Sequence, residues 1–137
     1  MKAIRVHDWQ QVAAVLEVAR ELGQLPILLS PQAGQCGIGW WRELIRRARE
    51  TFPDMAFETM LDCGPSAGLA LAAIRDGAGP VAVMVSSEVL EKLSDIARQA
   101  GTLATEGGKP ALDLAGMSDV SRTCRNWLTD QGTAPKT

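Results

Sequence analysis

Short apolar runs alternate with longer amphipathic stretches along most of this chain. Each run ends at a small polar or glycine-containing turn and is too short to form a helix; the four runs are Lys2–Val6, Pro26–Ser30, Ala56–Leu61 and Pro80–Val85. Strands that alternate with helices of about 10–15 residues indicate βαβ units, because parallel strands need a crossover connection. We therefore predict an α/β fold with about five mainly parallel strands, arranged as a half-barrel or as a flavodoxin-like open sheet.

Capping signals mark the helices between these runs. Asp8 with Gln11 three residues later is typical of a capping box, and Gly23 is typical of a helix end. The later helices are expected at about Gly39–Phe52, at Ser66–Asp76, from Ser86 or Ser87 to just before Gly101, and after a cap at Ser118. Residues 1–130 are expected to form one domain, and residues 131–137 a flexible tail.

The charge balance and the lack of long apolar stretches narrow the functional classes to which this protein could belong. The 137 residues carry 14 Lys and Arg against 16 Asp and Glu, so there is no basic excess that would favour nucleic acid or an anionic membrane. The first residues lack the apolar stretch of a signal peptide, and no segment approaches a membrane span. We expect a cytoplasmic protein that binds neither nucleic acid nor membrane.

The three cysteines form no closely spaced pair. Cys36, Cys63 and Cys124 are an odd number in a chain without a secretion signal, which favours free thiols over disulfides. With His7 as the only histidine, the spacing of a structural zinc module is also missing. We expect neither a metal nor another cofactor.

Ligands of parallel sheets bind beyond the carboxyl ends of the strands, so the candidates lie there. The candidate ligand-binding residues are Ser30, Gln32, Asp62, Ser86 and Ser87. The loop from Ser30 to Gly39 is glycine-rich but lacks the Lys-Ser/Thr ending of a phosphate loop. It is either a plain flexible loop or a place where a small anionic ligand meets a helix N-terminus.

The catalytic candidates are Asp62, Cys63 and Glu106. Asp62 could contact a ligand, or it could only hydrogen-bond the backbone of its own turn. Glu58 could share its strand face as a second carboxylate, or simply reach water from the strand start. Cys63 is a nucleophile only if a neighbour lowers its pKa; otherwise it is an inert buried thiol. Glu106 is either a catalytic carboxylate or a solvated loop residue.

Several stretches of this sequence, in their order, carry a resemblance to a known family. Leu61-Asp62-Cys63-Gly64 stands where that family has a Leu-Asp-His-Gly motif after its third strand. The other matching stretches are Ala3–Val6, Trp9–Leu22, Pro26–Pro31, Ala72–Gly77, Val81–Ser86 and Thr105–Gly107. Together they resemble the first half of the (β/α)₈ barrel of class II fructose-bisphosphate aldolases.

The resemblance implies the scaffold of that family without its metal chemistry. In the family, the aspartate at the position of Asp62 is the catalytic acid–base group, and the histidine after it binds the divalent metal. Here Cys63 replaces that histidine, and the half-barrel that supplies further metal ligands lies outside the resemblance. We therefore expect no metal-dependent aldol cleavage.

Two adjacent tryptophans predict self-association. Neighbouring helix residues point about 100° apart, so a single core face rarely buries both Trp40 and Trp41. We expect Trp41 in the core, and Trp40 together with Trp127 on a surface that a second copy covers. Unpaired strand edges also invite association, so a homo-oligomer is expected, in the form of a two-fold dimer.

Two functions remain open from the sequence. The first is a non-catalytic role in binding a small molecule or a protein, on an aldolase-like scaffold that has lost its metal site. The alternative is a small lyase-like enzyme that uses Asp62, with Cys63 or Glu106, at the strand carboxyl ends. The residues around those ends decide between them.

Overall fold

Residues 2–130 form an open α/β sheet of six strands, all parallel. The computed structural model describes residues 2–130, and the predicted tail at 131–137 lies outside them. The strands follow one another across the sheet in the order β5-β4-β3-β2-β1-β6, and the sheet does not close into a barrel. They are β1 (Ala3–Arg5), β2 (Ile27–Gln32), β3 (Glu58–Asp62), β4 (Val81–Val83), β5 (Ala104–Glu106) and β6 (Ala111–Asp113). The predicted α/β class is confirmed.

The helices follow the capping signals closely. They are α1 (Trp9–Leu22), α2 (Ala33–Cys36), α3 (Ile38–Thr51), α4 (Ala67–Arg75), α5 (Ser87–Gln99) and α6 (Val120–Thr129). The side chain of Asp8 accepts a hydrogen bond from the Gln11 N–H, and Gly23 ends α1 with a left-handed φ of 64°. The cap of α6 is Asp119 and not Ser118. Two elements were not predicted, namely α2 within the glycine-rich loop and the edge strand β6.

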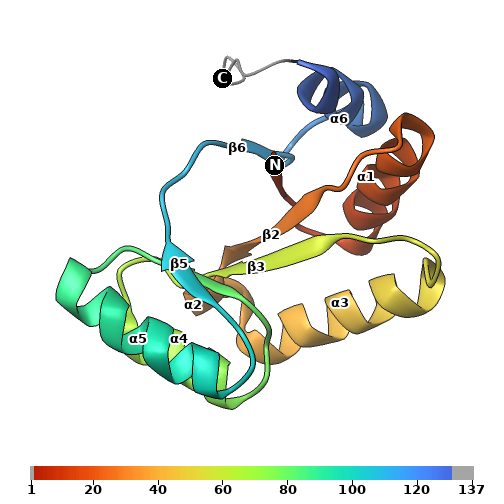
Figure 1. Ribbon diagram of the computed structural model, residues 1–137. Coiled ribbons are helices and arrows are strands. Elements are labelled where there is room, and N and C mark those ends of the chain that lie inside the picture. Colours follow the sequence, from red (N-terminus) through yellow and green to blue (C-terminus); the bar gives the residue numbers. More distant parts are fainter. Residues whose placement is uncertain (1, 131–137) are drawn as a thin grey trace. The chain divides into compact units, whose positions relative to one another are not determined.

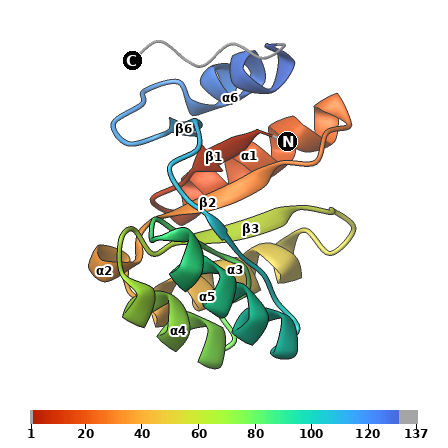
Figure 2. The ribbon, with the colours of Figure 1, turned by 60° about the vertical axis from the view of Figure 1, so that its left-hand side comes forward.

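Residues 2–29, 44–58 and 110–130 form one compact unit, which we call unit 1. Here β1 pairs with β6 in parallel, with Ile4 beside Leu112 and Arg5 beside Asp113. Ile4 and Leu112 are buried, whereas Arg5 and Asp113 are partly or largely exposed. The helices α1 and α6 lie side by side, as Figures 1 and 2 show.

Residues 30–43 and 59–109 form the second unit, unit 2. Its strands β3, β4 and β5 are parallel neighbours, and their aligned residues Leu61, Val81 and Ala104 share one face. The helix α4 packs against β4 and α5, and α5 packs against β5, so both helices cover this same face (Figure 2). Leu61 and Val81 are accordingly buried.

The structure confirms the predictions for Trp40 and Trp41 and contradicts the prediction for Trp127. Trp41 is fully buried and Trp40 is 38% exposed, as predicted. Trp127 is only 7% exposed, because its ring packs under Lys2 and its Nε1 donates a hydrogen bond to the Ala3 carbonyl at 3.1 Å. It therefore belongs to the core of unit 1, and the prediction that it adds exposed apolar surface was wrong.

Candidate functional site

Ser30 links the carboxyl ends of β2 and β3 through a hydrogen bond within unit 2. Its side chain is completely buried, and its Oγ accepts a hydrogen bond from the Asp62 N–H at 2.8 Å. The same hydroxyl donates to the Pro31 carbonyl at 2.6 Å. Ser30 thus has a structural role at the end of β2. Gln32, the last residue of this strand, is exposed beside the short helix α2.

The Asp62 carboxylate is hydrogen-bonded within its own turn. Its Oδ1 accepts a hydrogen bond from the Gly64 N–H at 2.9 Å, and Gly64 adopts a positive φ of 55°. An aspartate that accepts from the N–H two residues later forms an Asx turn, which is a common local role of this side chain. Along β3, Glu58, Met60 and Asp62 are all more exposed than the residues between them, so they share one face, and Glu58 reaches water at the strand start.

Cys63 is protected from reaction. The side chain is 3% exposed, and this burial raises the pKa of the thiol to about 11, with further contributions from negative charge on Asp62 and Cys36. The thiolate is the nucleophilic form of cysteine, so a thiol with such a pKa is protonated and unreactive near neutral pH. All three cysteines are free, as the sequence predicted.

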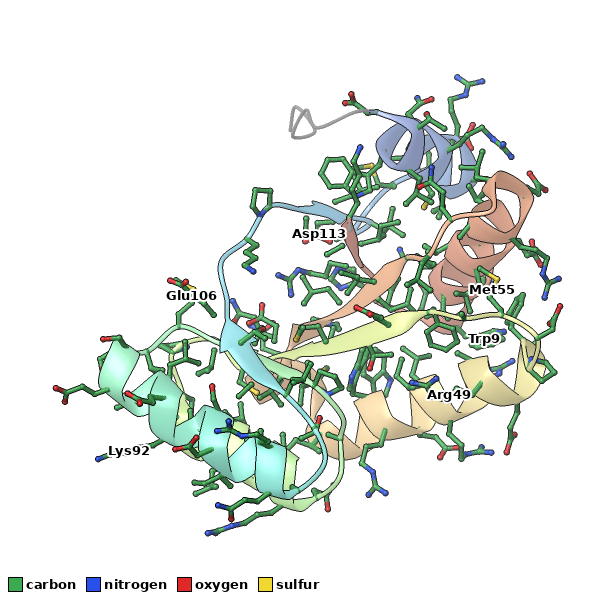
Figure 3. The ribbon with its side chains drawn as sticks, in the orientation of Figure 1. Trp9, Arg49, Met55, Lys92, Glu106 and Asp113 are labelled. Carbon is green, nitrogen blue, oxygen red and sulfur yellow. The ribbon has the colours of Figure 1, made fainter. Side chains whose placement is uncertain are left out.

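The remaining candidates of unit 2 lie at the ends of β4 and β5. The Ser86 Oγ accepts a hydrogen bond from the Val89 N–H at 3.3 Å and so caps α5, whose first residue is Ser87. Glu106 is the exposed last residue of β5 (Figure 3). The parallel pairing of β3, β4 and β5 brings Asp62, Ser86 and Glu106 to one edge of the sheet.

The helix N-termini differ in their capacity for an anion. In unit 1, α1 and α6 are capped by the carboxylates of Asp8 and Asp119, which would repel an anionic ligand. In unit 2, the caps of α4 and α5 are the neutral side chains of Ser66 and Ser86. Only these two of the four side-chain caps are compatible with the anionic ligand expected from the sequence.

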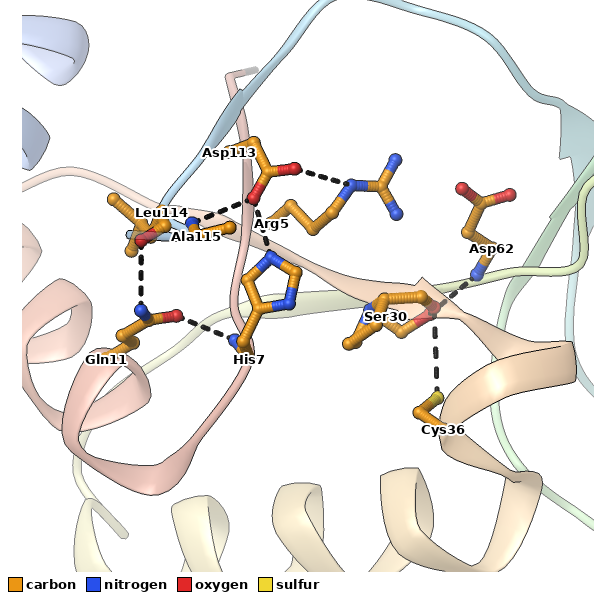
Figure 4. A network of polar contacts seen from close by, with 10 residues as sticks. Arg5, His7, Gln11, Ser30, Cys36, Asp62, Asp113, Leu114 and Ala115 are labelled. Atoms are coloured by element: carbon orange, nitrogen blue, oxygen red, sulfur yellow. Dashed lines mark hydrogen bonds and ion pairs between the residues drawn. The ribbon is translucent and has the colours of Figure 1, made fainter. Parts of the chain in front are cut away.

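Unit 1 contains a polar cluster that the sequence analysis did not predict. It lies at the carboxyl ends of β1 and β6 and is drawn in Figure 4. The His7 Nε2 lies 2.6 Å from Asp113 Oδ1, and the Arg5 Nε lies 3.9 Å from the other oxygen of this carboxylate. The Ala115 N–H also donates to Asp113 Oδ1, at 3.0 Å. Asp113 therefore faces a histidine, an arginine and a backbone donor.

Gln11 fixes the backbone on both sides of the cluster. Its Oε1 accepts a hydrogen bond from the His7 N–H at 2.7 Å, and its Nε2 donates to the Leu114 carbonyl at 3.0 Å (Figure 4). One side chain from the first turn of α1 thus joins the segments that follow β1 and β6. This leaves His7 and Asp113 little freedom to move apart.

The surroundings of Asp113 keep it ionised. Partial burial by itself would raise the pKa of Asp113, but the hydrogen bonds from Ala115 and His7 and the positive charges of His7 and Arg5 outweigh it, and the pKa lies below its ordinary value. An ionised carboxylate can only accept hydrogen bonds. The His7 Nε2 must therefore carry a hydrogen, and in the neutral ring Nδ1 keeps a lone pair.

A hollow of about 420 Å³ adjoins this cluster within unit 1. Asp8, which follows His7, and Gln11 line one side, and the residues before and in the first turn of α6 line the other. The lining is mostly polar, with Met117 and Val120 as its apolar members. This volume can admit a small molecule.

No family model matches the sequence, and no curated protein matches it either. Within residues 2–130, no three His, Cys, Asp or Glu side chains come together in a way that could hold a metal ion. In the same part of the chain, no helix combines the length and the apolar character needed to cross a membrane.

Proposed function

We propose that this chain is a non-catalytic protein-interaction domain on an aldolase-like scaffold, and that its partner is a second copy of itself. One observation carries the proposal: the strand face of unit 2 opposite α4 and α5 exposes two large apolar side chains. Leu103 and Met84 on this face are 61% and 56% exposed, the two largest exposures among the large apolar side chains of the described residues.

The strand register places these side chains on one face. Residues alternate between the two faces of a strand, so Ala82 and Thr105, which are paired, lie on the face opposite Val81 and Ala104, with Ala82 itself only 7% exposed. Leu103 then lies on the Thr105 side. The Met84 N–H continues the ladder by donating to the Gly64 carbonyl at 2.8 Å, which places its side chain on the Ala82 side.

The middle of this face is closely packed. The Thr105 Oγ1 lies 3.7 Å from the Met60 sulfur, and the side chain of Met84 lies against Gly107 and Gly108. We call Met60, Ala82, Met84, Leu103 and Thr105 the apolar stripe. None of the five is charged, as in the cores of protein interfaces, which are depleted of charge. Asp62, which pairs with Ala82, lies on the same face at the end of β3 and would stand at the rim of the contact.

The lyase-like alternative has less support. Asp62 is engaged in its own turn, and the Cys63 thiol is buried and protonated. We therefore propose no metal-dependent aldol cleavage by this chain. We also place the protein in the cytoplasm, because three free cysteines suit a reducing compartment.

Charge reversal within the stripe tests the proposal. The Leu103→Glu variant should be monomeric where the unchanged protein is dimeric, because each interface would then bury two unpaired carboxylates. Size-exclusion chromatography with light scattering reads the mass. Leu25→Glu is the matched control, because Leu25 is also an exposed leucine (38%) but belongs to unit 1.

A third variant separates the stripe from the surface that the sequence suggested. Trp40 lies on α3, with its ring centroid 6.5 Å from that of Trp41. If Trp40→Glu produced monomers while Leu103→Glu stayed dimeric, the interface would lie on α3 and the apolar stripe would not be the contact surface. A Leu103→Glu dimer with a dimeric Trp40→Glu would exclude both surfaces.

A further inference from the structure

We propose that oxidation of the Met84 sulfur separates the two copies, so that the apolar stripe is a redox-sensitive contact. This inference rests on the self-association proposed for unit 2 and adds its regulation. The modified group is the thioether of Met84, the oxidant is hydrogen peroxide, and the product is methionine sulfoxide. Sulfoxide formation turns an apolar side chain into a polar one, which disrupts interfaces that depend on methionine.

Met84 is open to solvent in a single copy. The residue is 56% exposed, more than any other methionine among residues 2–130. Its side chain lies against Gly107 and Gly108, where a Cβ at position 108 would be 3.4 Å from the Met84 Sδ and 3.6 Å from its Cε. The two glycines have no side chains that could cover the sulfur. Dissolved peroxide therefore reaches Met84 in the free copy.

Met60, the second methionine of the stripe, is held differently. It is only partly exposed, and the Thr105 Oγ1 donates a hydrogen bond to its sulfur at 3.7 Å. Within the described part of the chain, no hydrogen bond reaches the Met84 sulfur. The lone pairs of Met84 are thus available to an oxidant, whereas one lone pair of Met60 is engaged. Met84 is therefore the methionine of the stripe that we expect to react first.

The chemistry needs one molecule of hydrogen peroxide and no ionised group in the protein. The Met84 Sδ attacks one peroxide oxygen, and the sulfur–oxygen bond forms as the oxygen–oxygen bond breaks. The departing hydroxide takes the proton of the transferred oxygen and becomes water. The sulfur thereby loses two electrons and the peroxide gains them. A thioether has no proton to lose, so this reaction, unlike that of a thiol, does not depend on ionisation.

An oxidised stripe is costly to bury. The sulfoxide oxygen is a hydrogen-bond acceptor, but Ala82 and Leu103 have no side-chain donor, and the Thr105 hydroxyl already donates to Met60. A two-fold contact would bury two such oxygens. We therefore expect oxidation to raise the dissociation constant of the dimer by at least about tenfold. Because the contact covers Met84, peroxide acts on free copies and prevents them from associating again.

Peroxide treatment followed by sedimentation equilibrium tests the proposal. The unchanged protein should be dimeric before treatment and shift towards monomer once peptide mass spectrometry shows one added oxygen on Met84. Dithiothreitol, added before the measurement, reverses disulfides and sulfenic acid at the partly exposed Cys36 but leaves methionine sulfoxide in place. Met84→Leu should stay dimeric after the same treatment, because leucine is apolar and is not oxidised. Met117→Leu is the matched control, because Met117 is 42% exposed but belongs to unit 1, and it should respond as the unchanged protein does.

The rate of oxidation gives a second readout. In dilute solution Met84 should be oxidised at least as fast as Met117, because it is the more exposed of the two. Above the dissociation constant, the contact should slow the oxidation of Met84 and leave that of Met117 unchanged. Methionine sulfoxide reductases, with dithiothreitol as the reductant, should then restore the dimer of the oxidised protein.

The possible outcomes separate this inference from the proposed self-association. A dimer that survives complete oxidation of Met84, or a Met84→Leu dimer that still dissociates on treatment, would overturn the redox sensitivity alone. An unchanged protein that is monomeric before peroxide is added, or a rate at Met84 that does not depend on protein concentration, would overturn the contact through the apolar stripe and the redox sensitivity together.

Discussion

The two units share one construction and differ in the strand face that they leave bare. In each, parallel strands bury a row of aliphatic side chains, such as Ile4 and Leu112 in unit 1 or Leu61 and Val81 in unit 2. The opposite row is charged in unit 1, with Arg5 beside Asp113. In unit 2 it contains the apolar stripe, with Asp62 beside it at the end of β3. Helix packing dictates the buried rows, so the other rows are free to differ, and the proposed self-association rests on that difference.

The largest expected effect compares two neighbouring residues of β6. Leu112 points into the buried row and Asp113 into the charged row. Leu112→Ala should lower the free energy of unfolding by about 2–5 kcal/mol, because it removes buried methyl groups and leaves a cavity. Asp113→Ala should change it by about 1 kcal/mol, since an exposed ion pair contributes little. Urea unfolding followed by circular dichroism measures both, and equal losses would show that the two faces are not distinct.

One buried cysteine in each unit allows the stability of the two units to be compared. Cys124 belongs to unit 1 and Cys63 to unit 2; burial raises the pKa of each thiol to about 11. Under native conditions, a thiol reagent should label the partly exposed Cys36 first. Slow labelling of the other two, located by mass spectrometry, then reports the local opening of each unit. Equal rates would mean that the units open together, and rapid labelling of Cys63 would contradict its protection.

A smaller effect is expected at acid pH from the charged row of unit 1. Because the folded state holds the pKa of Asp113 below its ordinary value, its contribution to stability is present above that ordinary value. The contribution is lost as the pH falls through the folded pKa, so the window lies below about pH 4. Thermal midpoints measured from pH 6 to pH 2 should fall less in Asp113→Asn than in the unchanged protein. Parallel curves would show that Asp113 has no such role.

The sequence was sufficient to predict the elements whose signals are local. Asp8 and Ser86 marked helix starts because a capping side chain bonds to an N–H three residues later in the chain. The strand β6 was missed because it has only three residues, follows Pro110 and carries Asp113, so it shows no strand pattern. The prediction that Trp127 is exposed was wrong because helical spacing identifies one face of a helix but not the residues that pack against that face.

The residues of the polar cluster in unit 1 are far apart in the sequence, so no local pattern reveals that they meet. His7 and Asp113 are 106 positions apart, and they meet only because β6 pairs with β1 at the edge of the sheet. The sequence analysis considered His7 as a metal ligand and dismissed it for lack of other histidines. The one available sequence signal for Asp113, the partner of His7, was that an aspartate follows a short apolar segment there. For Asp62, by contrast, the local-turn alternative needed only Gly64, two residues away, and the structure has that hydrogen bond.

The most direct test of the central claim, that the bare face of unit 2 binds a second copy, is sedimentation equilibrium of the unchanged protein over a range of concentrations. An uncharged stripe with side chains as exposed as Leu103 and Met84 predicts a dimer at tens of micromolar, whose interface buries at least about 1,000 Å² in total. The mass should then be twice that of the 14.7 kDa chain. A single species with the mass of one chain at that concentration would contradict the account.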